Sequence, residues 1–342
     1  MNHSHDNLNA PAITLAHGEG GRLTRRLIEE NVTAVFDNPF LSSFDDAARL
    51  PQPDGPIAVT TDSFVVSPLF FPGGDIGKLA VYGTVNDLAV TGAKPLYITL
   101  AMIIEESLPI ATLERVLGSV AEAAANLHMP VVAGDTKVVP KGAADKLFLN
   151  TTGVGTLLYG APKGPSSLEV GDQLIVSGPI GRHGIAVMSA REGLGLDPPP
   201  HSDCAPLSSQ VRALVDAGIP IRAMRDATRG GLAAVLHEWA SCCDLTLRVE
   251  EQCIPVAPDV RGACELLGLD PIYVANEGTM LIAVPDEFSN PVLETLHNEG
   301  ASGAELIGSV VEQTMAPVVI RRGLGRMYPL DEPTGAMLPR IC

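Results

Sequence analysis

The strongest constraint on the fold is an alternation of strand-like and helix-like segments that occurs twice along the chain. Runs rich in β-branched residues indicate strands, and apolar residues spaced three and four apart indicate helices. In the first half, this pattern predicts helices near 21–32, 75–91 and 112–129 and strands near 55–69, 97–104, 130–139 and 146–158. A segment rich in Gly, Pro and Ser at 159–172 interrupts the pattern, which resumes at Gln173.

This interruption predicts two domains, because 342 residues also exceed the length of most single cores. The second half again mixes strands and helices, so we expect an α+β or α/β class. Helices are predicted near 183–193, 208–218, 230–241, 257–268 and 290–300, and strands near 173–177, 244–251, 278–285 and 304–312. The expected division is an N-terminal domain at 1–160, a C-terminal domain at 166–321 and a flexible tail at 322–342, where periodicity stops.

The charge of the chain disfavours several functions. The formal net charge is −17, from 23 Lys and Arg against 40 Asp and Glu. Nucleic-acid binding requires a basic face, so it is disfavoured. No segment reaches the ~20 apolar residues of a membrane helix, and the start of the chain has no apolar signal-peptide core. We therefore expect a cytoplasmic protein that binds neither nucleic acid nor a membrane.

Two standard nucleotide-binding signatures fail. In "GGDIGKL", Pro72 stands where a phosphate loop requires its first glycine, and Leu79 stands where Ser or Thr would bind Mg²⁺. In "GPIGRHG" the glycines are three apart, which is not the dinucleotide-binding spacing. Neither a P-loop NTPase nor a Rossmann dehydrogenase is supported.

Aspartates beside small residues recur through the first half, in "FDDAA", "TTDSF", "VNDLA" and "AGDTK". A carboxylate in an apolar run is costly to desolvate unless something pairs with it, and Mg²⁺ binds carboxylates together with phosphate oxygens. The set favours a Mg²⁺–nucleotide site, although each aspartate alone also suits a turn or a helix cap. Its members are Asp45, Asp46, Asp62, Asp87 and Asp135, with Asn86 and Lys137 beside two of them. The glycines of "HGEGGR" could approach a phosphate.

The second half offers fewer candidates. Asp226 and Thr228 in "DATRGG" suit an N-cap at a helix start, with an entry favourable to anions. Glu277 lies between Asn and Gly ahead of a strand. His183 and His237 are more typical of packed or surface residues than of acid–base groups.

The last residue, Cys342, is preceded by "LPRI". The other five cysteines lie between 204 and 264 and form no C-x-x-C pair, so we interpret them as reduced and structural; the role of Cys242 and Cys243 stays open. A terminal thiol could be incidental, a metal ligand or a nucleophile that must move. Prenylation is excluded, because it requires the cysteine four residues from the end.

The ordered set "DDAA", "TTD", "NDLA", "GDTK", "DATRGG" and "PRIC" resembles the HypE family of hydrogenase maturation factors. These carbamoyl dehydratases belong to a superfamily with aminoimidazole ribonucleotide synthetase, selenophosphate synthetase and thiamine-monophosphate kinase. The resemblance runs from about His17 to Cys342, and "PRIC" is its most specific part. It implies an N-terminal domain whose sheet forms a dimeric β-barrel with its mate, and a C-terminal α/β domain.

The resemblance implies an ATP- and Mg²⁺-dependent dehydration on the protein's own terminal thiol. HypF would load a carbamoyl group on Cys342, ATP would activate its oxygen, and the resulting cyano group would pass to iron on HypC–HypD for NiFe hydrogenase. Lys137 would assist phosphoryl transfer, Glu277 would remove amide protons and Arg340 would seat the tail. The implied ATP-binding residues are Asp45, Asp46, Asp62, Asp87, Asp135, Asn86, Gly134 and Thr136. The implied Mg²⁺ ligands are Asp45, Asp62, Asp87 and Asp135.

Two alternatives stay open at this point. One is another ATP-dependent synthetase or kinase of the superfamily acting on a small molecule. The absence of any cysteine before Cys204 disfavours a selenophosphate synthetase, which usually carries a reactive Cys or Sec near its start. The other is a non-catalytic scaffold with a terminal thiol, which would leave the aspartate set without a purpose.

Overall fold

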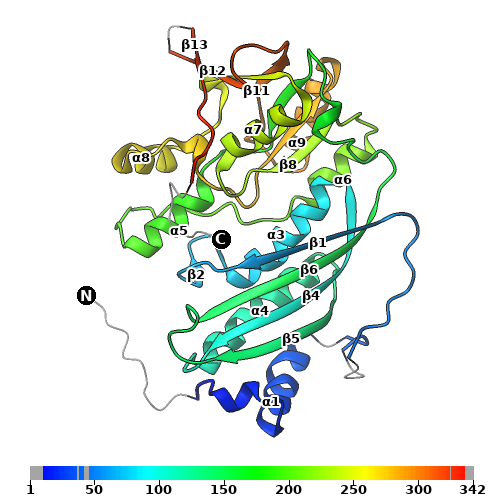
Figure 1. Ribbon diagram of the computed structural model, residues 1–342, viewed down its shortest axis with the longest axis vertical. Coiled ribbons are helices and arrows are strands. Elements are labelled where there is room, and N and C mark those ends of the chain that lie inside the picture. Colours follow the sequence, from blue (N-terminus) through cyan, green and yellow to red (C-terminus); the bar gives the residue numbers. More distant parts are fainter. Residues whose placement is uncertain (1–10, 37, 42–45, 324, 336–342) are drawn as a thin grey trace.

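A computed structural model describes residues 11–36, 38–41, 46–323 and 325–335, which form two α/β domains stacked along the long axis of the molecule (Figure 1). The elements of the N-terminal domain are α1 (Arg22–Leu27), α2 (Ala34–Phe36), β1 (Ile57–Phe64), β2 (Phe70–Phe71), β3 (Gly74–Asp75), α3 (Ile76–Val90), β4 (Ala93–Glu105), α4 (Ile110–Asn126), β5 (Val131–Val139) and β6 (Leu147–Leu157). A π-helical stretch, Ile28–Thr33, joins α1 to α2.

The elements of the C-terminal domain follow the linker. They are β7 (Gln173–Val176), α5 (Arg182–Glu192), α6 (Ser208–Asp216), β8 (Ala223–Asp226), α7 (Gly231–Cys243), β9 (Thr246–Glu250), α8 (Pro258–Leu267), β10 (Met280–Val284), α9 (Ser289–Asn298), β11 (Glu305–Val311), β12 (Val318–Arg322) and β13 (Arg326–Pro329). No helix in the described ranges is long and apolar enough to cross a bilayer.

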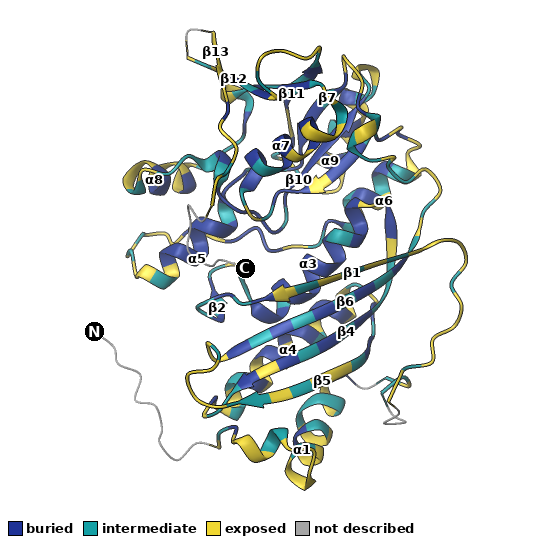
Figure 2. Ribbon diagram, viewed as in Figure 1, coloured by how far each residue is buried: buried dark blue, intermediate teal, exposed yellow. Residues whose placement is uncertain are grey.

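The sheet of the N-terminal domain has the strand order β1-β6-β4-β5, with only β4 and β5 parallel among its neighbours. Helices α3 and α4 cover one face. Residues of α3 are buried on almost every side, because the helix lies between this sheet and α6 and β8 of the second domain (Figure 2). Its small and apolar residues suit this position, since Gly83 lies where a side chain would overlap the ring of Phe64.

The opposite face of this sheet is not covered by the described residues. Ile57 and Val59 on β1 are 57% and 64% exposed, and Ile103 on β4 is 42% exposed. Within the described ranges the sheet is open, and it does not close into a barrel. The barrel that the family resemblance implies would therefore require a second copy of the chain.

The sheet of the C-terminal domain has the strand order β13-β12-β9-β11-β7-β10-β8. Residues on its strands alternate between two cores. Leu174 and Val176 face α7, whereas Ile175 faces α6 and α9. Strand β8 is the edge nearest to α3, so the first sheet, α3 and the second sheet form successive layers.

The predicted start of the flexible tail, at residue 322, is wrong. Residues 326–329 form β13, which pairs antiparallel with β12. The next residue, Leu330, is buried and donates its backbone N–H to the carbonyl of Val318 at 3.0 Å. Its own carbonyl lies 3.0 Å from Nε2 of His237. Residues 326–329 show no periodicity, but a short edge strand does not require any. Because β13 pairs with β12, ordered structure continues past the predicted boundary at 322.

Candidate active site

Four carboxylates converge where the two domains meet. Asp62 lies on the face of β1 that is directed toward α3, Asp87 on α3, and Asp226 at the end of β8. Glu277 lies in the loop before β10 and is 4% exposed, as is Asp226. The hydroxyl of Thr60, on the same face of β1 as Asp62, donates to Oδ2 of Asp87 at 2.8 Å. Two strands, a helix and a loop from both domains thus bring the acidic groups together.

Burial raises the pKa values of these carboxyls. Desolvation raises the pKa of Glu277 well above its usual value, and the nearby carboxylates of Asp226, Asp203, Asp62 and Asp87 raise it further. Desolvation, followed by the charge of Asp87, raises the pKa of Asp226 to about 7. The pKa values of Asp62 and Asp87 are raised by the same main cause.

Within the described residues, no cation forms an ion pair with these carboxylates, although Arg225 and Arg229 lie near enough to lower the pKa values of three of them in part. None of the ion pairs in the described part of the chain involves Asp62, Asp87, Asp226 or Glu277, and Arg225 pairs with Glu238 at 3.0 Å instead. Hard oxygen donors without a protein counter-ion suit Mg²⁺. However, no three His, Cys, Asp or Glu side chains in the described ranges are already arranged as a metal centre.

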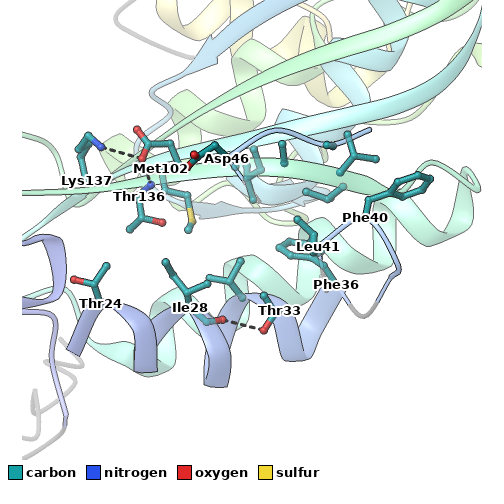
Figure 3. A pocket seen from close by; sticks show the side chains of 18 of the residues that line it. Thr24, Ile28, Thr33, Phe36, Phe40, Leu41, Asp46, Met102, Thr136 and Lys137 are labelled. Atoms are coloured by element: carbon teal, nitrogen blue, oxygen red, sulfur yellow. Dashed lines mark hydrogen bonds and ion pairs between the residues drawn. The ribbon is translucent and has the colours of Figure 1, made fainter. Parts of the chain in front are cut away.

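A separate pocket of about 390 Å³ lies between the first helices and the β5 edge of the sheet (Figure 3). Ile28, Phe36 and Leu41 line its apolar part, and Thr136 and Lys137 lie at its polar end. A cavity with an apolar part for a base and a polar end for phosphates suits a nucleotide. Its volume is in the range typical of small-molecule sites.

The polar end of this pocket contains a close ion pair. Nζ of Lys137 lies 2.9 Å from Oδ1 of Asp135, and this hydrogen bond is the main reason why the pKa of Asp135 is lowered. Both side chains are more than half exposed, so the pair can exchange its partners for a ligand at little cost. Asp46, Gly18 and Gly20 also line the pocket, which places the predicted glycine-rich loop beside it.

The structure separates the predicted aspartate set into two groups. Asp62 and Asp87 lie in the carboxylate cluster, whereas Asp46 and Asp135 line the pocket. Strands β1 and β5 are the two edges of the sheet, about 14 Å apart at the usual strand spacing. The described part of one chain therefore does not gather the set at one point. Asp45, Arg340 and Cys342 lie outside the described residues.

Three other predicted nucleotide ligands have different outcomes. Gly134 and Thr136 line the pocket, and their contact with a nucleotide stays a prediction. Asn86 does not line the pocket, because its side chain is 1% exposed and its polar atoms are already occupied. Its Nδ2 donates to the carbonyls of Ala205 and Glu277, and its Oδ1 accepts from the N–H of Leu207. Asn86 instead ties the two domains together, which does not support its predicted role as a nucleotide ligand.

The sequence interpretation also missed the position of Asp226. Helix α7 begins at Gly231 with Gly230 in the left-handed conformation as its N-cap, so Asp226 does not cap it. Asp226 instead ends a four-residue strand and enters the carboxylate cluster. The available signal was an aspartate four residues before a glycine pair that opens a helix.

Family models match both halves of the chain. The N-terminal domain of AIR synthase related proteins matches residues 44–157, and the corresponding C-terminal domain matches residues 169–320. Carbamoyl dehydratase HypE of Escherichia coli (strain K12) is 46% identical over 337 residues, covering 96% of this chain and 99% of that protein. The HypE of Rhizobium leguminosarum bv. viciae is 46% identical over 335 residues, covering 96% and 95%.

Solved structures agree with these matches. HypE in complex with ATP is 43% identical, with a TM-score of 0.91 over 96% of this chain and 99% of that one. A HypE–HypF complex is 45% identical, with a TM-score of 0.79 over 90% and 99%. This chain therefore belongs to the HypE family of AIR synthase related proteins.

Proposed function

We propose that this protein is an ATP-dependent carbamoyl dehydratase of hydrogenase maturation that converts an S-carbamoyl group on its own Cys342 into a thiocyanate. The observation that carries the proposal is the end-to-end match, at 46% identity, to a carbamoyl dehydratase. The apolar and polar ends of the pocket beside β5 add physical support for ATP, as does the similarity to a HypE that binds it. Nothing favours a small-molecule kinase or a scaffold.

The reaction couples loss of an oxygen to phosphate transfer. In the first step, the carboxamide oxygen attacks the γ-phosphorus, ADP leaves, and one N–H proton leaves the nitrogen. In the second step, the other N–H proton leaves, the C–O bond breaks and phosphate departs, so S–C≡N remains. One proton ends on the phosphate and the other reaches solvent. Lys137 would neutralise charge on the transferring phosphoryl group, and Glu277 would accept protons from nitrogen.

The donor set fits a divalent cation. Asp62 and Asp87 would hold Mg²⁺ in the cluster, where the position of Asp226 adds a further carboxylate. Asp135, at the other edge of the sheet, could join the same ion only from a second copy of the chain, and the role of Asp45 as a ligand stays a prediction. Bound Mg²⁺ would offset the charge of the triphosphate. Binding a cation here would also offset the desolvation, and the smaller mutual repulsion, that raise the pKa values of Glu277, Asp226 and Asp87.

A second copy of the chain would complete the site. Lys137 lies on the β5 edge, whereas Glu277 lies with Asp62 near the β1 edge. A homodimer that covers the open face of the sheet, with its exposed Ile57 and Val59, would bury apolar surface and close a barrel. We propose that it also brings Lys137 of one copy toward Glu277 of the partner.

The proposed partners follow from the need for the Cys342 thiol to react at more than one protein. HypF would load Cys342, consistent with the similarity to a HypE–HypF complex, and an HypC–HypD complex would accept the cyano group. Gly335 is the last described residue. The seven residues that follow can span at most about 23 Å when extended, which is enough to carry a terminal thiol between nearby sites.

The test follows the mass of the C-terminal peptide. The protein is incubated with HypF, carbamoyl phosphate and a limiting amount of ATP, freed of HypF and of nucleotide, and then given Mg²⁺–ATP. We expect the chains that still carry a carbamoyl adduct on Cys342 to lose one water only after this second addition of ATP. Cys242→Ser should behave like the wild type, because Cys242 is an exposed thiol elsewhere, and Cys342→Ser should show no adduct. An unmodified Cys342 with ATP consumed on a small molecule would reject the proposal.

A further inference from the structure

A short crossing segment, residues 202–207, connects the two domains beside Glu277. At its start, Ser202 donates its backbone N–H to the carbonyl of Pro72 in the N-terminal domain at 2.9 Å. The hydroxyl of Ser202 lies 2.8 Å from Nδ1 of His183, a fully buried residue of α5 in the C-terminal domain. The crossing segment is therefore anchored to both domains before it reaches the active-site loop.

Asp203 uses both carboxylate oxygens to hold the loop that carries Glu277. Its Oδ1 accepts the backbone N–H of Glu277 at 3.1 Å. Its Oδ2 accepts the N–H of Gly278 at 3.1 Å and the hydroxyl of Thr279 at 2.9 Å. Asp203 is only 9% exposed. Charge-assisted hydrogen bonds of this kind are about twice as strong as neutral ones.

The main chains of the crossing segment and the loop are in direct contact. A Cβ atom at Gly278 would overlap the carbonyl oxygen of Asp203. The absence of a side chain at 278 thus lets the loop lie flat against the crossing segment, and Asp203 then fixes its position along that segment.

Asn86 adds the connection to α3. Its Nδ2 donates to the carbonyl of Glu277 at 3.1 Å and to that of Ala205 at 3.0 Å, and its Oδ1 accepts from the N–H of Leu207 at 2.8 Å. Asp87 is the next residue of the same helix. One amide therefore sets the distance between the main chain of Glu277 and the helix that carries Asp87.

We propose that Asp203 and Asn86 are positioning residues for Glu277. They hold the main chain of its loop so that the Glu277 carboxylate meets the reacting carboxamide. Neither needs to contact ATP or the carbamoyl group. The inference rests on the proposed role of Glu277 as proton acceptor. A displacement of about 1 Å at a reacting group can lower a rate by about 100-fold.

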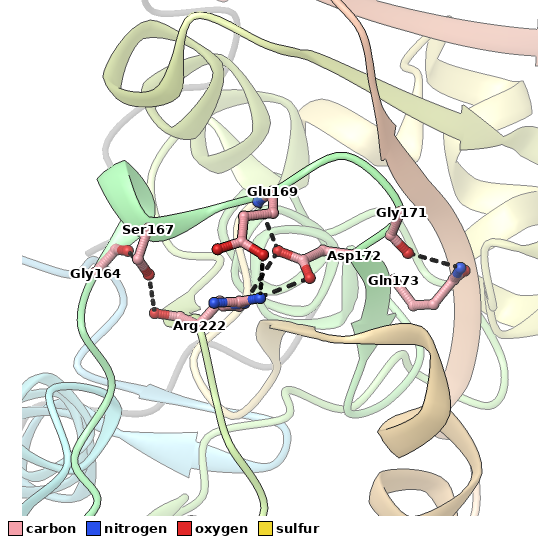
Figure 4. Close-up of polar contacts among 7 residues, drawn as sticks. All are labelled: Gly164, Ser167, Glu169, Gly171, Asp172, Gln173 and Arg222. Carbon is pink, nitrogen blue, oxygen red and sulfur yellow. Dashed lines mark hydrogen bonds and ion pairs between the residues drawn. The ribbon is translucent and has the colours of Figure 1, made fainter.

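The experiment compares Asp203→Asn with Asp172→Asn. Asp172 is a matched control, because it is also a buried aspartate, at the end of the linker, whose carboxylate accepts the N–H of Glu169 and pairs with Arg222 (Figure 4). The pre-carbamoylated full-length protein is given Mg²⁺–ATP, and thiocyanate formation is followed by mass in a single turnover. We expect Asp203→Asn to be slower by about 10- to 100-fold with unchanged ATP affinity, and Asp172→Asn to keep the wild-type rate.

The Glu277→Gln background separates positioning from general damage. If Asp203 acts through Glu277, adding Asp203→Asn to Glu277→Gln should slow the residual reaction no further. Three results would each overturn the proposal. They are a fall in rate from Asp203→Asn that is as large in Glu277→Gln as in the wild type, a loss of ATP affinity in Asp203→Asn, and a wild-type rate in Asp203→Asn. A wild-type rate in Glu277→Gln alone would instead reject the role of Glu277. Should Asp203→Asn not fold, Thr279→Val removes one bond, with Thr279→Ser as its control.

Discussion

At the level of single residues, the buried carboxylates should make stability depend on pH. The pKa of Asp226 is about 7 in the folded protein and 3.8 in its unperturbed state. Between these values the folded state binds the extra proton, so stability falls as pH rises from about 4 to 7. The penalty that accumulates between pH 5 and pH 7 is about 2 kcal/mol. Asp226→Asn removes it, and the Tm of this variant should exceed that of the wild type by more at pH 8 than at pH 5.

Asp135→Asn provides the contrast for this prediction. The pKa of Asp135 is lowered, mainly by its hydrogen bond to Lys137, so its ionised form favours folding above its unfolded pKa. Asp135→Asn should therefore give no gain in Tm at pH 8. A gain for Asp226→Asn that is the same at pH 5 and pH 8 would show that Asp226 is already ionised in the folded protein.

At the level of elements, Arg222 forms two ion pairs that hold the linker to the C-terminal domain (Figure 4). Nε of Arg222 lies 3.4 Å from Oδ2 of Asp172, whose side chain is 3% exposed. Nη2 of Arg222 lies 2.6 Å from Oε2 of the exposed Glu169. Removing the partner of a buried charge costs about 3–5 kcal/mol, whereas an exposed pair contributes about 0–1 kcal/mol. Arg222→Met should lower the free energy of unfolding by several times more than Glu169→Gln, as urea titration would measure. Equal losses would mean that Asp172 does not depend on Arg222.

The elements also show where sequence reasoning ends. Helix α3 and strands β1, β4, β5 and β6 follow from local periodicity, and they lie where it predicts them. Periodicity does not detect β8 or β13, because neither four-residue strand contains a continuous apolar run and both depend on neighbouring strands. The motifs singled out Asp62 and Asp87, which lie in the carboxylate cluster. The neighbouring Asn86 points instead toward the crossing segment and bonds to it. This contact could not be predicted locally, because the crossing segment lies more than 110 positions further along the chain.

At the level of the whole molecule, the positions of Lys137 and Glu277 lead to a test of a shared site. They lie near opposite edges of one open sheet, so a composite site would take one from each copy. Lys137→Ala and Glu277→Gln should each lower the rate of dehydration to a small residual value and leave ATP binding intact. A symmetric dimer has two such sites, and a mixed dimer of the two variants contains one intact site.

Mixing the two inactive variants should therefore restore activity. After subunit exchange at equal amounts, half of the dimers are mixed and each has one working site, which gives roughly a quarter of the wild-type rate. Thiocyanate on the pre-carbamoylated chains is the readout, and each variant mixed with itself is the control. If both residues act within one chain, the mixture stays inactive, because every site then lacks one of the two side chains. The proposed contact between the two copies is the open face of the sheet, which includes the exposed Ile57 and Val59. A charge on this face, as in Val59→Asp, should keep the chain monomeric and abolish the restored activity.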